Sequence, residues 1–148
     1  MQIDNIYQWL VDDIAPVKTP GVFEFHRGLS GRELMEIEEE GSLPEDYRMF
    51  LMKFGGGGLF RHWMHSSFIL WFERKPRTLG RENGDKWLFI GLYENSSLIL
   101  KKSEKCRSYD PQVYMVVGGC GLKSIGNAFN DGLKSLYSKA KGKFGVRR

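Results

Sequence analysis

The sequence predicts a single α+β domain: N-terminal helices, a central and mostly antiparallel sheet of about four to six strands, and a C-terminal helix packed on the sheet. Three observations predict this class. The chain has 148 residues, of which 41% are hydrophobic, and this length is usual for one domain with one core. Apolar residues recur at helical spacing near both ends, whereas short aromatic and branched runs occupy the middle. Helices followed by strands favour α+β over alternating α/β.

The first helix is predicted between residues 3 and 14. Apolar residues lie on one helical face at Ile3, Ile6, Tyr7, Leu10, Val11 and Ile14. Pro16 is a stop signal for this helix. A loop follows, with a short extended piece at Val22–Phe25.

The second helix is short and acidic. Ser30 and Glu33 have the spacing of a capping box, in which each side chain satisfies the other residue's free amide. Gly41 is the expected C-terminal stop. This helix therefore begins near residue 31.

The third helix follows directly. Pro44 is expected at its first helical position, where the missing N–H costs nothing. Its inward face holds Tyr47, Phe50, Leu51 and Phe54. The glycine run Gly55–Gly58 ends it by capping and backbone bending.

After the glycines the apolar pattern becomes that of strands. Short runs rich in aromatic and branched residues predict buried strands, and a turn-type cluster at Tyr93–Ser96 predicts a hairpin. We expect a polar loop at Arg74–Lys86, between two of the strands. The predicted strands are Ser67–Phe72, Trp87–Ile90, Leu98–Lys101 and Gln112–Val117, and an amphipathic helix follows from Phe129 to Ala140.

No motif in the chain favours catalysis. His62 and His65 lack further metal ligands at a suitable spacing. The loop Gly118–Ser124 fails both phosphate-binding patterns, because Leu122 and Ser124 stand where glycine is needed. The two cysteines, Cys106 and Cys120, fit reduced thiols in a cytoplasmic protein. We therefore expect no enzyme activity, no catalytic or metal-binding residue and no cofactor.

Charge is distributed unevenly along the chain. The net charge is +4, yet residues 139–148 hold five basic residues and no acid, so the rest of the chain is slightly acidic. We assign residues 1–140 to the domain and residues 141–148 to a basic C-terminal tail. The opposite pole is Glu33–Asp46, which contains no Lys or Arg. An acidic surface of this kind favours docking of a basic partner.

The segment Leu43–Leu51, followed by Gly55-Gly56-Gly57, resembles the SUKH superfamily. Members of that superfamily carry a helix opened by "LPxDYxxFL" and closed by a "GG" turn. The likeness extends from about residue 28 to about residue 140. Its supporting segments are Trp87–Gly91, Asn95–Leu100, Val113–Val117, Phe129 and Leu133–Tyr137.

The resemblance implies an α+β fold and a binding role without catalysis. Bacterial members are mostly immunity proteins, which bind a secreted or contact-delivered toxin, often a nuclease, and block it in the cytoplasm. Eukaryotic relatives serve as regulatory adaptors. We therefore expect an immunity protein whose partner is a cognate toxin, with an adaptor of an endogenous protein as the alternative. We expect no membrane, nucleic-acid or small-molecule partner.

Charge and exposure suggest the residues that contact this partner. Acidic side chains on the second helix are expected to steer it, and a short segment after the glycine run is expected to anchor it. The six residues are Glu36, Glu39 and Glu40 for steering, and Arg61, His62 and Trp63 for anchoring.

Overall fold

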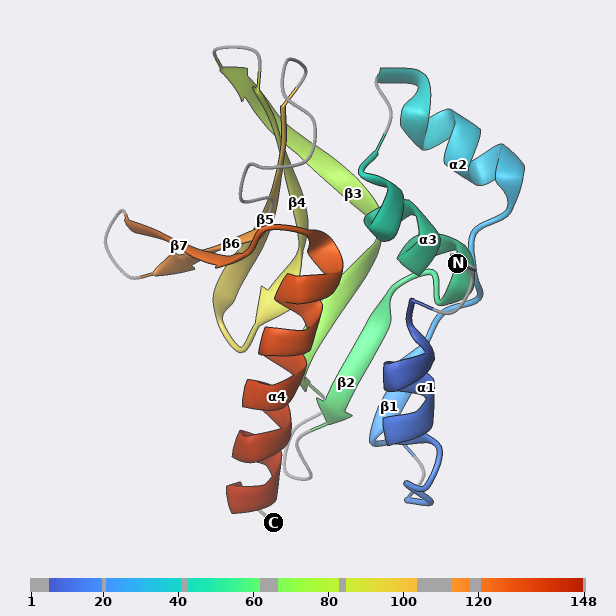
Figure 1. Ribbon diagram of the computed structural model, residues 1–148, viewed down its shortest axis with the longest axis vertical. Coiled ribbons are helices and arrows are strands. Elements are labelled where there is room, and N and C mark those ends of the chain that lie inside the picture. The colour runs from blue at the N-terminus through green and yellow to red at the C-terminus, as the bar shows by residue number, and fades with distance from the viewer. Residues whose placement is uncertain are drawn as a thin grey trace.

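The computed structural model describes residues 6–19, 21–40, 43–61, 67–82, 85–103, 113–117 and 121–147. It has the predicted α+β class (Figure 1). The helices are α1 (Gln8–Ile14), α2 (Gly31–Ile37), the 3-10 helix η2 (Glu38–Glu40), α3 (Glu45–Lys53) and α4 (Phe129–Arg147). The strands are β1 (Phe23–Phe25), β2 (Gly57–Arg61), β3 (Phe68–Glu82), β4 (Asp85–Tyr93), β5 (Ser96–Ser103), β6 (Val113–Val117) and β7 (Gly121–Gly126).

The seven strands form one antiparallel meander in the order β1-β2-β3-β4-β5-β6-β7. The predicted count of four to six was therefore too low. The predicted loop Arg74–Lys86 was also wrong, because most of it forms the outer arms of the β3–β4 hairpin, with Arg81 opposite Lys86. Its side chains are polar because part of this hairpin end is exposed, and a polar exposed strand has the composition of a loop. The predicted hairpin at Tyr93–Ser96 is confirmed.

The helices pack on one face of the sheet. Helix α4 crosses this face with α3 beside it (Figure 1). Between them lies an aromatic cluster in which the Phe50 ring is 5.1 Å from Phe72 and 5.0 Å from Phe129, centroid to centroid. Tyr47 is 4.8 Å from Phe129. Tyr47, Phe50 and Leu51 are fully buried, so their predicted role in the core is confirmed.

Helix α2 begins as predicted. The Ser30 hydroxyl oxygen accepts from the Glu33 N–H at 3.2 Å, and the Glu33 carboxylate accepts from the Ser30 N–H at 3.1 Å. Pro44 lies one residue earlier than predicted: it is the N-cap of α3, outside the helix, because its ψ of 140° is extended. Gly55 has a φ of 69°, a left-handed conformation that suits glycine after a helix.

Both ends of the chain reach the helical face. Helix α1 begins at Gln8 and ends at Ile14, and residues 3–5 of its predicted span lie outside the described residues. Helix α4 continues without a break past residue 140 to Arg147. The Lys141 Nζ lies 3.1 Å from Asp13 Oδ2 on α1, and the Lys143 Nζ lies 2.6 Å from Glu94 Oε1. Residues 141–147 are therefore helical, and the charges of Lys141 and Lys143 contact the body of the protein.

Candidate partner-binding surfaces

The second face of the sheet carries a row of aromatic side chains. Residues paired across antiparallel strands point to the same face. The register pairs Trp71 with Gly58 and Leu92, Phe89 with Ile99, and Trp87 with Lys101. We call this surface the aromatic face and define it by Phe68, Trp71, Trp87, Phe89 and Tyr114. Apart from the buried Phe89, these residues are partly exposed.

The rings of the aromatic face contact one another. The Phe68 and Trp71 rings are stacked with centroids 5.9 Å apart, and the Trp87 and Tyr114 rings are 5.5 Å apart. Gly58 makes room for the first pair, because a Cβ there would lie 2.2 Å from Phe68 Cδ2. These contacts hold the rings in place on the surface, as in a preorganised binding site.

Three cations lie over this face. The Arg61 guanidinium lies 4.8 Å from the Phe68 centroid and the Arg77 guanidinium 4.6 Å from the Phe89 centroid. The Lys101 ammonium lies 5.8 Å from the Trp87 ring. Arginine, tryptophan and tyrosine are the residues most enriched in the energetic centres of protein interfaces.

Arg61 therefore lies on a candidate binding surface, at the end of β2. Its terminal nitrogen also makes a 2.5 Å ion pair with Glu24 Oε2 on β1. The two residues predicted beside it, His62 and Trp63, lie outside the described residues.

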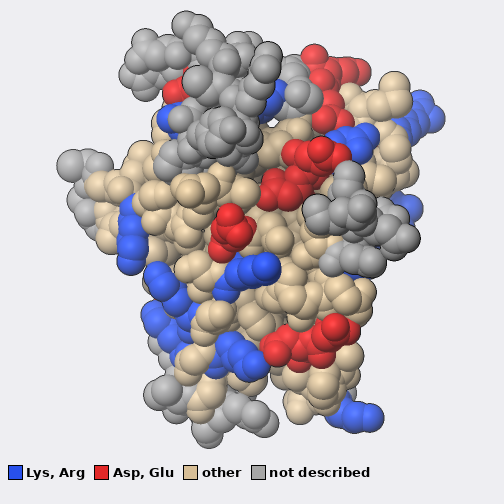
Figure 2. All heavy atoms as spheres, viewed as in Figure 1, with Lys and Arg blue, Asp and Glu red and all other residues tan. Residues whose placement is uncertain are grey.

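A second candidate surface is acidic. Glu36 and Glu39 are exposed and line a cavity of about 260 Å³ between α2–η2 and the β3–β4 hairpin, opposite Lys75 and Lys86. Neither glutamate makes an ion pair with a described residue. The side chain of Glu40 lies outside the described residues. In Figure 2, Asp and Glu gather over α2, η2 and α3 at the upper right, whereas Lys and Arg gather over α4 at the lower left.

Other acidic residues of the segment Glu33–Asp46 make hydrogen bonds within the protein. Glu38 accepts from the Leu43 N–H and from Arg48 Nε, each at 2.9 Å. Asp46 Oδ2 accepts from the Asn130 N–H at the start of α4 at 2.8 Å, and burial raises the pKa of this carboxyl. Glu36 and Glu39 differ from these residues because their charges face solvent.

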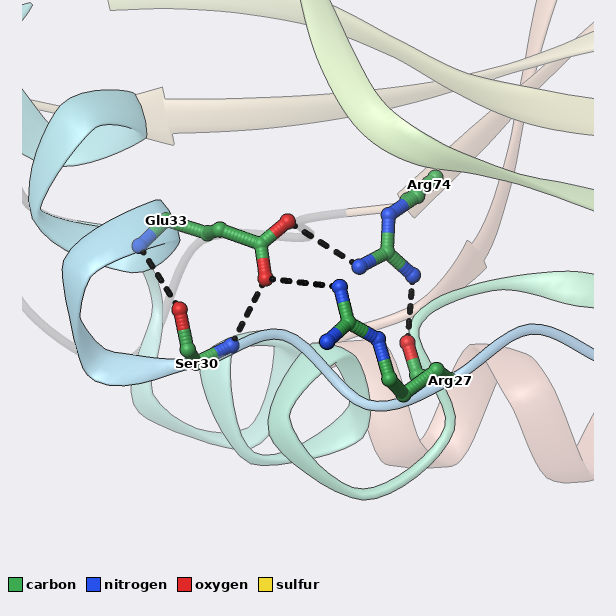
Figure 3. A network of polar contacts seen from close by, with 4 residues as sticks. All are labelled: Arg27, Ser30, Glu33 and Arg74. Carbon is green, nitrogen blue, oxygen red and sulfur yellow. Dashed lines mark hydrogen bonds and ion pairs between the residues drawn. The ribbon is translucent and has the colours of Figure 1, made fainter.

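Glu33 fixes α2 against the sheet (Figure 3). Its second carboxylate oxygen lies 3.0 Å from an Arg74 nitrogen on β3, and Arg27 lies 3.6 Å from the first oxygen. Arg74 also donates to the Arg27 carbonyl oxygen. The Ser30 N–H and the Arg74 guanidinium lower the pKa of Glu33 to about 2. Glu33 thus positions the acidic surface instead of forming part of it.

The structure does not bring the two predicted groups together. Arg61 pairs with Phe68 at the beginning of β3, whereas Glu36 and Glu39 face Lys75–Thr78 farther along that strand. The acidic surface also lies on the helical side, because the cavity is lined by the core residue Leu88. The sequence prediction missed Trp71, Trp87 and Tyr114. Their alternation with buried neighbours was the available signal, but Trp71 and Trp87 lie in the two runs, Ser67–Phe72 and Trp87–Ile90, that the sequence analysis interprets as buried strands.

The described residues contain no helix long and apolar enough to cross a membrane. Within the same ranges, no three His, Cys, Asp or Glu side chains gather in a potential metal-binding cluster. Cys106, Cys120 and His65 lie outside the described residues.

The fold and these surfaces are typical of an α+β interaction domain. Comparison with known families identifies which one: the SMI1 / KNR4 family (SUKH-1) matches residues 28–135, about three quarters of the chain. The protein belongs to this family, as its Leu-Pro helix and glycine turn predicted. A search of curated proteins and a search of solved structures returned no significant match.

Proposed function

We propose that this protein is an immunity protein, which binds a cognate toxin in the cytoplasm and neutralises it by occluding its functional surface. Membership of the SUKH-1 family supports a protein that acts by binding a protein partner. The toxin is a secreted or contact-delivered protein, such as a nuclease. No cofactor is needed, because inhibition by occlusion is stoichiometric.

The observation that carries the proposal is the aromatic face. Trp71, Trp87 and Tyr114 are partly exposed on the sheet, and the Arg61 and Arg77 guanidinium groups lie over neighbouring rings. Such residues supply large contact area with little loss of conformational entropy. We therefore place the body of the toxin on this face.

The acidic surface has a separate role in this proposal. Glu36 and Glu39 lie on the opposite side of the sheet, so they attract a basic toxin at a distance and do not contact it. Attraction of this kind raises the association rate more than it lowers the dissociation rate. Steering and contact can therefore be separated by experiment.

The first test is protection of a sensitive bacterium that expresses the toxin candidate encoded beside this gene. The expected result is growth in the presence of this protein and a co-purifying one-to-one complex. Absence of both would reject the immunity proposal and favour the alternative, a regulatory adaptor of an endogenous protein.

The second test measures association of the purified pair at several salt concentrations. Replacement of Glu36 and Glu39 by glutamine should slow association by about three- to tenfold and flatten its salt dependence. The control is Asp12→Asn, which removes an exposed charge on α1 and should change the rate little. An equal effect of both changes would assign steering to net charge and not to this surface.

A further inference from the structure

A second cavity opens between the last turns of α4, the segment that joins α1 to β1, and the end of β2. We call it the terminal groove. It has a volume of about 700 Å³, which is within the range of ligand-binding sites. Its walls are mainly apolar, with Arg61 and Lys141 among them; the apolar side chains are Val17, Val22, Phe23, Phe60 and Phe144.

Phe60 adopts an unusual backbone conformation in this wall. Its φ is 59°, a left-handed value that is strained for a non-glycine residue. Its ring packs against Phe23, Tyr137 and Phe144, with centroids 5.0, 5.1 and 5.3 Å away. Strain of this kind concentrates at functional sites. Here it places an aromatic ring between β1 and α4.

Arg61 has a hydrogen-bond donor without an acceptor among the described residues. Its Nε is buried and has no hydrogen-bond partner among the residues that the structure describes. Another nitrogen of the same guanidinium is held by Glu24. A Cβ at Gly21 would lie 3.9 Å from this Nε, so Gly21 and the donor face each other in the groove wall. A buried donor without an acceptor is costly, so an acceptor that reaches this Nε by displacing the groove wall relieves that cost.

Gly145 keeps the groove clear on the α4 side. A glycine inside a helix destabilises the helix relative to alanine. Gly142 and Gly145 both lie in α4, and a Cβ at either position would meet no atom within 4 Å. Only Gly145 lines the groove. The two glycines therefore form a matched pair for an experiment.

Most of the groove lies outside the part of the chain that matches the family. The match covers residues 28–135, whereas the groove is lined from both flanking segments, with only Phe60 and Arg61 from inside the match. The groove is therefore formed mainly by the segments that flank the matched region. It also adjoins the aromatic face, because Arg61 lines the groove and lies over the Phe68 ring of that face.

We propose that the terminal groove binds an apolar side chain of the partner protein that stands next to a carboxylate. The side chain packs among Phe23, Phe60 and Phe144. The carboxylate accepts from Arg61 Nε and lies near the Lys141 ammonium, which Asp13 already holds 3.1 Å away. This inference rests on the proposed function and names the chemistry of the contact that gives partner specificity.

The direct test uses N-acetyl-L-phenylalanine as the probe, because it carries an aromatic side chain beside a carboxylate. In an NMR titration, the amide signals of Gly21 and Gly145 should shift and saturate. The Gly145→Leu variant should bind about tenfold more weakly, whereas Gly142→Leu should bind as the unaltered protein does. The neutral amide of the same probe should also bind about tenfold more weakly, because it cannot supply the charged acceptor.

Equal binding by the two glycine variants, equal binding of acid and amide, or no saturable shift would each overturn the proposal. The same variants are then tested for protection against the toxin: Gly145→Leu should lose it and Gly142→Leu should keep it. Equal protection by both would reject the groove while the immunity proposal stands. Probe binding without any protection by the unaltered protein would reject the immunity proposal instead, and would retain the groove as a binding site.

Discussion

Aromatic residues have different roles on the two faces of the sheet. On the helical face, Phe50, Phe72 and Phe129 are at most 1% exposed. On the aromatic face, Phe68, Trp71, Trp87 and Tyr114 pack on one another and beneath cations, yet keep part of their rings exposed. An aromatic residue in an antiparallel sheet thus serves the core or an interface according to which face the helices cover.

Removal of a core ring should have the largest effect on stability. Phe50 is fully buried and contacts Tyr7, Phe54, Phe72 and Phe129. The change Phe50→Ala should lower the free energy of unfolding by about 3–5 kcal/mol, because it removes the ring and leaves a cavity. Denaturant unfolding of both proteins measures this loss. A cost below about 1 kcal/mol would contradict the assignment of this face as the core.

Removal of a ring from the aromatic face should affect binding instead. The change Trp71→Ala should weaken the toxin complex by about 2 kcal/mol or more, the usual cost at an interface hot spot. Its cost in unfolding free energy should be well below that of Phe50→Ala, because Trp71 is only partly buried. Calorimetric titration and denaturant unfolding give the two values. The comparison fails if Trp71→Ala destabilises the protein as much as Phe50→Ala does.

A change at Gly58 should disturb the aromatic face without touching the core. A Cβ at this position would overlap the Phe68 ring, so Gly58→Ala forces the ring to move. We expect a loss of about 1–3 kcal/mol in unfolding free energy, and a changed near-ultraviolet spectrum as the Phe68–Trp71 stack is broken. Gly80→Ala is the control, since a Cβ there meets no atom within 4 Å. Similar losses for both variants would show that Phe68 does not occupy this space.

The smallest expected effect is the loss of the Glu33 contribution to stability at low pH. Because the pKa of Glu33 is lowered from 4.5 to about 2 in the folded protein, its carboxylate stabilises the fold above about pH 4.5, and this contribution is lost as the pH falls toward 2. The stability difference between the unaltered protein and Glu33→Gln should therefore be larger at pH 7 than at pH 3. Glu36→Gln is the control, because Glu36 makes no ion pair with a described residue. A difference that does not depend on pH would rule out the Glu33–Arg74 contact as its source.

Local signals predicted the helical side of the fold well. Ser30 and Glu33 mark the start of α2, and the spacing of Tyr47, Phe50 and Leu51 marks the buried side of α3, because these patterns depend on neighbours within one or two turns. The strands were harder to predict, since β-bulges between Phe72 and Arg77 and between Phe89 and Gly91 break the alternation.

The candidate binding surfaces were harder to predict from the sequence than the strands. Charge and exposure predict Arg61 as an anchor, and the structure adds a context that the sequence does not show: it lies above Phe68 and beside Gly21. The terminal groove joins Val17, Phe60 and Phe144. No pattern within a short window connects residues so far apart, because packing of the whole chain brings them together.

The nearest-neighbour order of the strands also bears on self-association. Among the described strands, only β1 and β7 lie at the ends of the sheet. Free backbone groups at a sheet edge invite other chains to add strands. Here β1 has three residues and β7 has six, with the exposed Lys123 on it. Short edges and an edge lysine oppose such addition. Addition of further strands at these two edges is therefore disfavoured.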